Sequence, residues 1–370
     1  MLVTWWTQLT PPNLADPPSD PAASTPTTPP ANPYFELEDL DESPLAGLPF
    51  DVHARADLTV AHFGDSRNVD GYDRNFVNTL SPALSARWEP YEGYRLLTEI
   101  EYSGRDGKLE VDQLLVEADF LAGRARLGTG LTYVPFGIER RFYSPVSNPL
   151  VDRPSPFQRV FPGSYSDIGV FLSGGLNGES GRGFEAEVAL TRSLRGPRRE
   201  DRADGFLRED EEGQMAGRLG VQVTPHLAVG VSGLITWFER YGVNRRLDLY
   251  GVDVLWQTEF EHVRFEFVGG HVEEPRLRGG DFHRSGWYVE FYRRFPIDRP
   301  YLKAIETVVR IDSLDEDSRV RDFRDVERWA FGINWVSTRH SRLKFQYEVS
   351  DERGHEISNN AFFTQLEVHF

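Results

Sequence analysis

Residues 361–370, the last ten of the chain, alternate between two kinds of side chain. Successive side chains of an extended strand point to opposite faces, so this segment has one apolar face and one largely polar face. The apolar face carries Phe362, Leu366, Val368 and Phe370, and the other carries Gln365, Glu367 and His369. Such a strand suits a wall between an apolar medium and water, provided that neighbouring strands pair with its backbone.

The same period of two recurs from about residue 51 onwards, and no comparable helical period is present. Clear examples are Trp329, Phe331, Ile333 and Trp335, and then Leu343, Phe345, Tyr347 and Val349. The pattern predicts sixteen strands, at 52–62, 76–88, 92–102, 108–121, 124–134, 166–174, 183–191, 214–224, 226–238, 245–257, 262–271, 284–295, 300–311, 327–337, 341–350 and 361–370.

The connections between these strands alternate in length. The long ones include 63–75, 135–165, 192–213, 272–283, 312–326 and 351–360. The short ones lie near 89–90, 122–123, 224–225, 295–300 and 338–340. Long loops at one end and tight turns at the other are typical of an outer-membrane barrel, whereas a soluble β-sandwich has little reason to sort its loops. We therefore expect an all-β fold, a transmembrane antiparallel β-barrel of sixteen strands over residues 51–370.

Composition is compatible with this fold and excludes several functions. No run approaches the ~18 apolar residues of a membrane-spanning helix, and 13% of the residues are aromatic, which suits interfacial girdles. The formal charge of −17 argues against nucleic-acid binding. The absence of Cys excludes disulfides and thiolate metal sites. We expect no cofactor and no metal.

A chain that ends on an aromatic residue at the close of an amphipathic strand resembles a bacterial outer-membrane β-barrel protein, a family in which that strand is the assembly signal. The resemblance implies an outer-membrane location, contact with lipid for Phe362, Leu366, Val368 and Phe370, and a watery lumen for the opposite face. Residues 1–10 have no basic region and no apolar core of a signal peptide, so we expect that the signal was removed or that the start is misplaced.

Residues 1–50 are expected to form a largely disordered periplasmic linker. Residues 11–33 are rich in Pro, Ser, Thr, Ala and Asp and contain too little apolar surface to fold. An even number of strands places both termini in the periplasm. The linker is either a simple spacer or a tether to peptidoglycan or a periplasmic partner.

The longest connection, 135–165, carries a second resemblance. It opens with Pro135-Phe136-Gly137-Ile138-Glu139 and closes with Phe161-Pro162-Gly163 before a Gly-containing strand. This element is similar to that of the phosphate-selective porins of the O/P type. The resemblance implies a trimeric sixteen-stranded channel for small solutes or ions, in which inward-folded loops form a basic constriction.

The residues of this loop lead to a related expectation. Loops longer than ~12–15 residues are usually functional or disordered, and the prolines and aromatic residues of this one favour a docked loop in the lumen. Its charged residues are Glu139, Arg140, Arg141, Asp152, Arg153 and Arg159, a surplus of positive charge. Guanidinium groups at a constriction would attract anions such as phosphate. Alternatively, these arginines pair with carboxylates and only attach the loop to the wall.

The expected lumen wall is mixed and more acidic than basic. Its inward positions include Arg95, Arg124, Arg126, Glu99 and Glu117. The further acids are Glu101, Asp119, Glu185, Glu187, Asp253, Glu266, Glu290, Glu348 and Glu367, and the further bases are Arg264, Arg294, Arg328 and Lys344. A Lys-rich element, expected of a strict phosphate channel, is missing. The pattern therefore supports a porin more strongly than it supports phosphate selectivity.

We expect no enzyme. Gly128-Thr129-Gly130 lies within an expected strand and opens no helix, and no Gly-x-Ser-x-Gly element occurs. The acidic residues Asp312, Asp315, Glu316 and Asp317 are interpreted as a solvated external loop, and they lack the spacing of an EF-hand. The alternatives are an outer-membrane enzyme such as a lipase, a tethered structural barrel with a plugged lumen, and a soluble β-rich binding protein.

Replacing Arg140 and Arg141 by neutral residues should shift permeability away from anions, because a narrow pore strengthens each charge at its constriction. The reversal potential in a KCl gradient measures this shift. Neutralising Asp315 and Glu316 is the control, on the expectation that both are screened by solvent. An unchanged reversal potential in both double variants would mean that the arginines only attach the loop to the wall.

Overall fold

The computed structural model describes residues 50–63, 76–104, 107–139, 147–161, 165–177, 182–192, 213–240, 243–273, 280–320, 325–338, 340–353 and 360–370. Its elements are β1 (Phe50–Phe63), β2 (Phe76–Tyr91), β3 (Tyr94–Ser103), β4 (Lys108–Phe120), β5 (Ala125–Tyr133), α1 (Pro156–Arg159), β6 (Ser166–Asn177), β7 (Gly183–Thr191), β8 (Gln214–Thr224), β9 (Leu227–Arg240), β10 (Val243–Gln257), β11 (Glu261–Val272), β12 (Phe282–Arg299), β13 (Leu302–Asp315), β14 (Val326–Thr338), β15 (Ser341–Glu352) and β16 (Ala361–His369).

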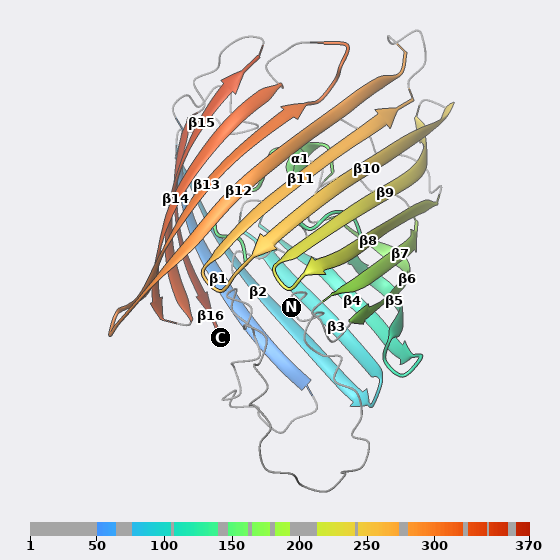
Figure 1. Ribbon diagram of the computed structural model, residues 1–370, viewed down its shortest axis with the longest axis horizontal. Coiled ribbons are helices and arrows are strands. Elements are labelled where there is room, and N and C mark those ends of the chain that lie inside the picture. The colour runs from blue at the N-terminus through green and yellow to red at the C-terminus, as the bar shows by residue number, and fades with distance from the viewer. Residues whose placement is uncertain are drawn as a thin grey trace, which may run out of the picture.

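The strands form one closed antiparallel barrel in which each strand pairs with its neighbours in sequence (Figure 1). The first and last strands close it, with Arg55 opposite His369 and Phe63 opposite Ala361. Closure leaves no sheet edge with unpaired backbone groups, which is the condition for a barrel in a bilayer. The expected sixteen-stranded antiparallel barrel is confirmed, and each expected strand agrees with an observed one to within a few residues at its ends.

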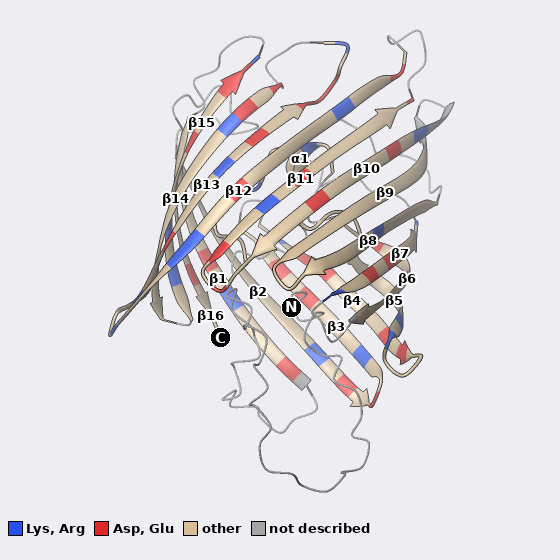
Figure 2. Ribbon diagram, in the orientation of Figure 1, with Lys and Arg blue, Asp and Glu red and all other residues tan. Residues whose placement is uncertain are grey.

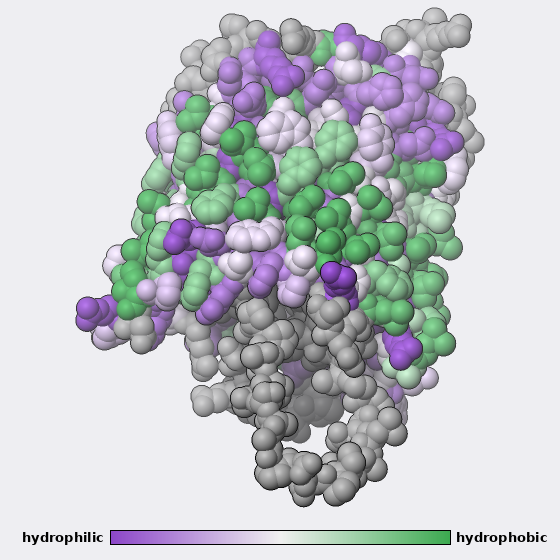
Figure 3. Space-filling view, in the orientation of Figure 1, coloured by the Kyte–Doolittle hydropathy of each residue, from purple (hydrophilic) through white to green (hydrophobic). Residues whose placement is uncertain are grey.

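The outward positions of the strands are apolar. The C-terminal strand follows the expected register: Phe362, Leu366 and Phe370 are exposed on the outside, whereas Glu367 and His369 are buried inside. Figure 3 shows the resulting apolar band on one face, below a hydrophilic rim. Aromatic side chains are exposed toward both margins of the band: Trp237, Tyr250, Trp287, Trp329 and Tyr347 toward one, and Trp88, Tyr94, Phe295, Tyr301 and Trp335 toward the other.

Inward positions carry the charged residues, which recur along the strands in Figure 2. On β11 to β15, many of these are fully buried, including Arg264, Glu290, Glu306, Arg310 and Lys344, each at most 1% exposed. Charged residues are almost never buried to this extent unless they are paired. Something inside the barrel must therefore cover this part of the wall, and the loop between β5 and β6 does so.

The strand β4 departs from regular alternation at Asp112. The register slips between Glu99 and Ile100 of β3, so that Asp112 is the extra residue between Val111 and Gln113. A β-bulge of this kind re-aims side chains. Here the consequence is that Asp112 and Gln113 are both buried, while Val111 and Leu114 are both exposed on the outside.

None of the described helices is long and apolar enough to cross a membrane. The described α-helix, α1, has four residues and lies inside the barrel (Figure 1). The expected linker lies outside the described residues, apart from Phe50 at its boundary.

Replacing Ile333, which is outward-facing and 58% exposed, by Arg should destabilise the barrel by about 2–4 kcal/mol, because a charge at the middle of the apolar band must leave water. The midpoint of urea unfolding in detergent measures this cost. Val320→Arg is the matched control. Val320 is exposed in the loop after β13, and a substitution there should change stability by less than about 0.5 kcal/mol. Equal costs at both positions would contradict the assignment of the band.

Candidate functional site: the loop inside the barrel

The loop that joins β5 to β6 enters the barrel and binds the opposite wall. Its base is closed by a hydrogen bond from Val134 N to Tyr165 O at 3.0 Å. Beyond this base, Gly137 N donates to Ser232 Oγ of β9 at 2.9 Å, and Ile138 N donates to Glu266 Oε1 of β11 at 2.9 Å. The loop therefore crosses the lumen within a few residues of leaving the wall.

Three residues of the Pro-Phe-Gly-x-Glu element, Gly137, Ile138 and Glu139, shape the turn of this crossing. Gly137 has a φ of +65°, which favours glycine, and a Cβ there would collide with the Glu266 carboxylate. That carboxylate accepts the backbone N–H groups of Ile138 and Glu139 and the hydroxyl of Tyr288. One buried side chain thus satisfies the turn at which the loop meets the wall.

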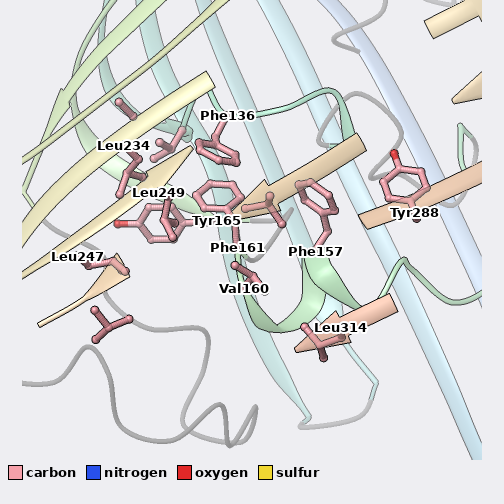
Figure 4. Packing of buried hydrophobic residues seen from close by; sticks show 14 of the residues in the cluster. Phe136, Phe157, Val160, Phe161, Tyr165, Leu234, Leu247, Leu249, Tyr288 and Leu314 are labelled. Carbon is pink, nitrogen blue, oxygen red and sulfur yellow. The ribbon is translucent and has the colours of Figure 1, made fainter. Parts of the chain in front are cut away.

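An apolar cluster holds the two ends of the loop against the wall (Figure 4). Phe136 packs on Phe161 with ring centroids 4.5 Å apart, and Phe157 meets the ring of Tyr288 edge-on at 5.8 Å. All four side chains are at most 1% exposed. Burying such large side chains stabilises the docked loop by about 1.5–3 kcal/mol each relative to an exposed loop.

The middle of the loop has little secondary structure, so its backbone needs partners from the wall. The wall supplies basic and amide side chains. The donors and the carbonyl oxygens that accept from them are Lys344 Nζ and Asn148 O at 2.8 Å, Asn334 Nδ2 and Pro149 O at 2.8 Å, Arg310 Nη1 and Asp152 O at 2.9 Å, Arg328 and Arg153 O, and Arg284 Nη2 and Arg159 O at 2.6 Å. The wall arginines therefore bind loop carbonyls.

Two aspartates tie this backbone network to the charged wall. Asp152 of the loop pairs with Arg328, and Asp312 of β13 accepts hydrogen bonds from Ser155 Oγ at 2.6 Å and from Arg310 Nε at 3.1 Å. Burial alone would raise the pKa of Asp152, but Arg328 and Arg310 outweigh it and lower this pKa below its ordinary value. Asp152 is therefore held in its charged, paired form.

The interpretation of the acidic residues after residue 311 as a solvated external loop is wrong for Asp312 and Glu316. The strand β13 continues to Asp315, which places Asp312 inside the lumen at 0% exposure. Glu316 pairs with Arg159 at 2.9 Å, with its side chain 10% exposed. Neutralising Glu316 is thus no test of a screened charge, because it also releases a loop arginine.

The expected constriction residues are placed as follows. Arg140 and Arg141 lie outside the described residues. Arg153 lies 3.8 Å from Glu139, measured from Nε to Oε1, and Arg159 pairs with Glu316. Burial raises the pKa of Glu139, which the nearby Arg153 and Arg264 offset only in part. The two described arginines are thus attached to the loop and its wall.

The expected wall residues separate into three places. Arg95, Arg126 and Glu117 come together with Asp119, which accepts from Arg126 Nε at 2.9 Å. Glu99 lies in a different group, where it pairs with Arg55 at 3.3 Å. Arg124 precedes β5, in the turn after β4, and is exposed there.

Three inward residues with strong contacts, Arg342, Glu306 and Arg218, were not predicted from the sequence, although their partners Glu367 and Asp253 were. Arg342 pairs with Glu306 at 3.2 Å and with Glu367 at 3.0 Å, and Arg218 pairs with Asp253 at 2.7 Å. The alternation of β13 and β15 indicates Glu306 and Arg342 as inward, so this signal was present. Among the described residues, no group of three or more His, Asp or Glu side chains could hold a metal ion.

Comparison with known sequences finds a relative for part of the chain only. No family model matches the chain. A curated relative, an uncharacterized protein of Aquifex aeolicus, is 26% identical over 185 residues, which are 47% of this chain and 42% of the relative. The chain thus matches less than half of the length of that relative.

Solved structures resemble the chain over nearly its whole barrel. The anion-selective porin from Comamonas acidovorans has a TM-score of 0.61 at 11% identity, covering 87% of this chain and 99% of the porin. The fold is that of the sixteen-stranded bacterial porins. OprB of Pseudomonas putida has a TM-score of 0.56 at 11% identity, covering 88% and 95%. OmpT of Vibrio cholerae, in its trimer form, has a TM-score of 0.56 at 10% identity, covering 87% and 99%.

Replacing Arg328 by Gln should loosen the docked loop and lower the free energy of unfolding by about 3–5 kcal/mol, because Asp312, Asp152 and Glu348 lose a shared buried partner. Urea unfolding in detergent and open-channel current noise measure the two effects.

Arg87→Gln is the matched control for this substitution. Arg87 also points inward, but it pairs with the half-exposed Glu89, so its loss should cost less than about 1 kcal/mol. If the Arg328 variant is as stable and as quiet as the Arg87 variant, the wall arginines do not hold the loop.

Proposed function

We propose that this protein is an outer-membrane porin, a passive diffusion channel for small hydrophilic solutes or ions. The observation that carries the proposal is a closed sixteen-stranded barrel with an apolar outside, a charged inside and a loop bound within the lumen. The likeness to porin structures supports the same assignment. An outer-membrane location follows from it.

The loop covers one part of the lumen wall and leaves another part accessible. Wall charges on β11 to β15 are sealed beneath the loop, as the near-zero exposure of Arg310 and Glu290 indicates. On β1 and β3, in contrast, the side chains of Arg55, Glu99 and Glu101 remain 11%, 14% and 16% exposed. Because these three point inward, their exposed atoms face the lumen, which supports a path for solutes along β1 to β4.

The resemblance to the phosphate-selective porins rests chiefly on the Pro135 to Glu139 element. In this chain that element shapes the turn that docks the loop. The described arginines of the loop, Arg153 and Arg159, pair with Glu139 and Glu316, so they add little support for a phosphate preference. An anion preference would therefore depend on Arg140 and Arg141.

Planar-bilayer recording tests the proposed function. The purified protein should insert in discrete current steps with a linear current–voltage relation, as expected of an open, passive pore. Folded barrel in the bilayer without conductance would instead favour a structural barrel with a plugged lumen. Heat-modifiable gel mobility of the same sample establishes that the barrel is folded.

We also propose a homotrimer, by analogy with the trimer form of OmpT. The mass of the protein in mild detergent, measured by light scattering, should equal three chains and should persist on dilution. A stable monomeric mass would contradict the trimer and leave the pore assignment unaffected. A role for residues 11–33 in contacting peptidoglycan remains a separate proposal.

A further inference from the structure

Four carboxyl groups and one guanidinium group lie near one another in the lumen wall formed by β1, β3 and β4. The carboxylates belong to Asp57 of β1, Glu99 and Glu101 of β3, and Asp112 of β4. Arg55 binds Glu101 at 2.7 Å and Glu99 at 3.3 Å, and it also acts electrostatically on Asp57 and Asp112. We call these five residues the acidic station.

The sequence of β2 makes this arrangement possible. Arg55 stands opposite Ala83, and Ala83 stands opposite Glu101 on the next strand. The neighbouring inward residue Ser85 is also small, and it stands opposite Glu99. Because no large side chain rises from β2 between them, the guanidinium of β1 reaches over this strand to the carboxylates of β3.

Asp112 differs from the other carboxyl groups of the station in its surroundings. It is the bulge residue of β4 and is 7% exposed. Its Oδ2 atom is buried without a hydrogen-bond partner in the part of the chain that the structure describes. Burial acts most strongly on this carboxyl group, followed by the nearby carboxyl groups of Glu101 and Glu99 and then by Arg55 and Arg153. A buried carboxyl oxygen beside two further carboxyl groups is unfavourable in its charged form unless a positive charge compensates it or a proton neutralises it.

The described part of the loop brings one arginine, Arg153, near Asp112. Arg153 also lies 3.8 Å from the buried Glu139, measured from Nε to Oε1. Within the acidic station, one guanidinium group stands against four carboxyl groups, so carboxyl groups are in excess at this part of the wall.

We propose that the acidic station is a binding site for permeating cations, and that it makes the pore prefer small monovalent or ammonium-bearing solutes over anions. This inference rests on the proposed function as a diffusion pore. The described side chains show no grouping that could hold a metal ion, which favours a weakly held, mobile cation over a chelated metal. Weak binding is what conduction requires, because the ion must also leave.

The test is the reversal potential of single pores in a tenfold KCl gradient. The wild-type pore should prefer K⁺ over Cl⁻. Asp112→Asn should lower the ratio of K⁺ to Cl⁻ permeability by about two- to threefold. This is the effect expected when one charge is removed at ~7 Å from an ion in a water-like dielectric. Asp57→Asn should act in the same direction and provides a second variant if Asp112→Asn does not fold.

Asp317→Asn is the matched control, because Asp317 lies in the loop after β13 and pairs with Arg319 at 2.6 Å. It should leave the permeability ratio unchanged. The acidic station would be overturned if the wild-type pore preferred Cl⁻. It would also be overturned if the ratio of K⁺ to Cl⁻ permeability were unchanged in every folded variant of Asp112 and Asp57. Either result would leave the proposed function as a diffusion pore unaffected. A folded protein that never conducts would overturn the proposed function and this inference together.

Discussion

Every backbone group within a barrel must find a hydrogen-bond partner, and the structure depends on how this chain meets that requirement. The strands close into a cylinder, so that the backbone N–H and C=O groups of each strand pair with those of its neighbours. The loop after β5 has little secondary structure, so the wall must supply its partners. Glu266 accepts its N–H groups, whereas Lys344 and Arg310 donate to its carbonyl oxygens. The charged wall thus acts first as a receptor for the chain's own loop.

This use of the wall divides the lumen into two regions. Beneath the loop, Arg310, Arg328 and Asp312 are buried and mutually paired. Removing water strengthens each of these attractions but makes any unpaired charge costly. The network therefore stabilises the fold only when every charge in it is paired. On β1 and β3, the side chains of Arg55, Glu99 and Glu101 remain partly exposed to the lumen, and carboxyl groups outnumber basic groups around Arg55. A count of charges over the whole wall hides this difference.

Much of the fold was predictable because each strand separates two media. The alternation of Phe362, Glu367 and Phe370 determined which side faces outward, and the long and short connections indicated the two ends of the barrel. The predictions were wrong where a strand extends beyond its obvious apolar residues. The strand β13 continues through Asp312, so an expected loop residue became a buried partner of Arg310 and Ser155. The bulge at Asp112 also broke the alternation that the reasoning relied upon.

The sequence by itself determined the closed β-barrel, its outward face and the presence of a restricted loop, because these follow from local periodicity and from the proline and aromatic content of one segment. Only the tertiary structure decided which charges pair. Arg55 meets Glu101 across β2, and Asp152 meets Arg328 across the lumen, over separations of 46 and 176 residues. No local pattern encodes such contacts, since they depend on the register of every intervening strand and on the wall to which the loop binds. The charge that a permeating solute meets is therefore a property of the folded barrel.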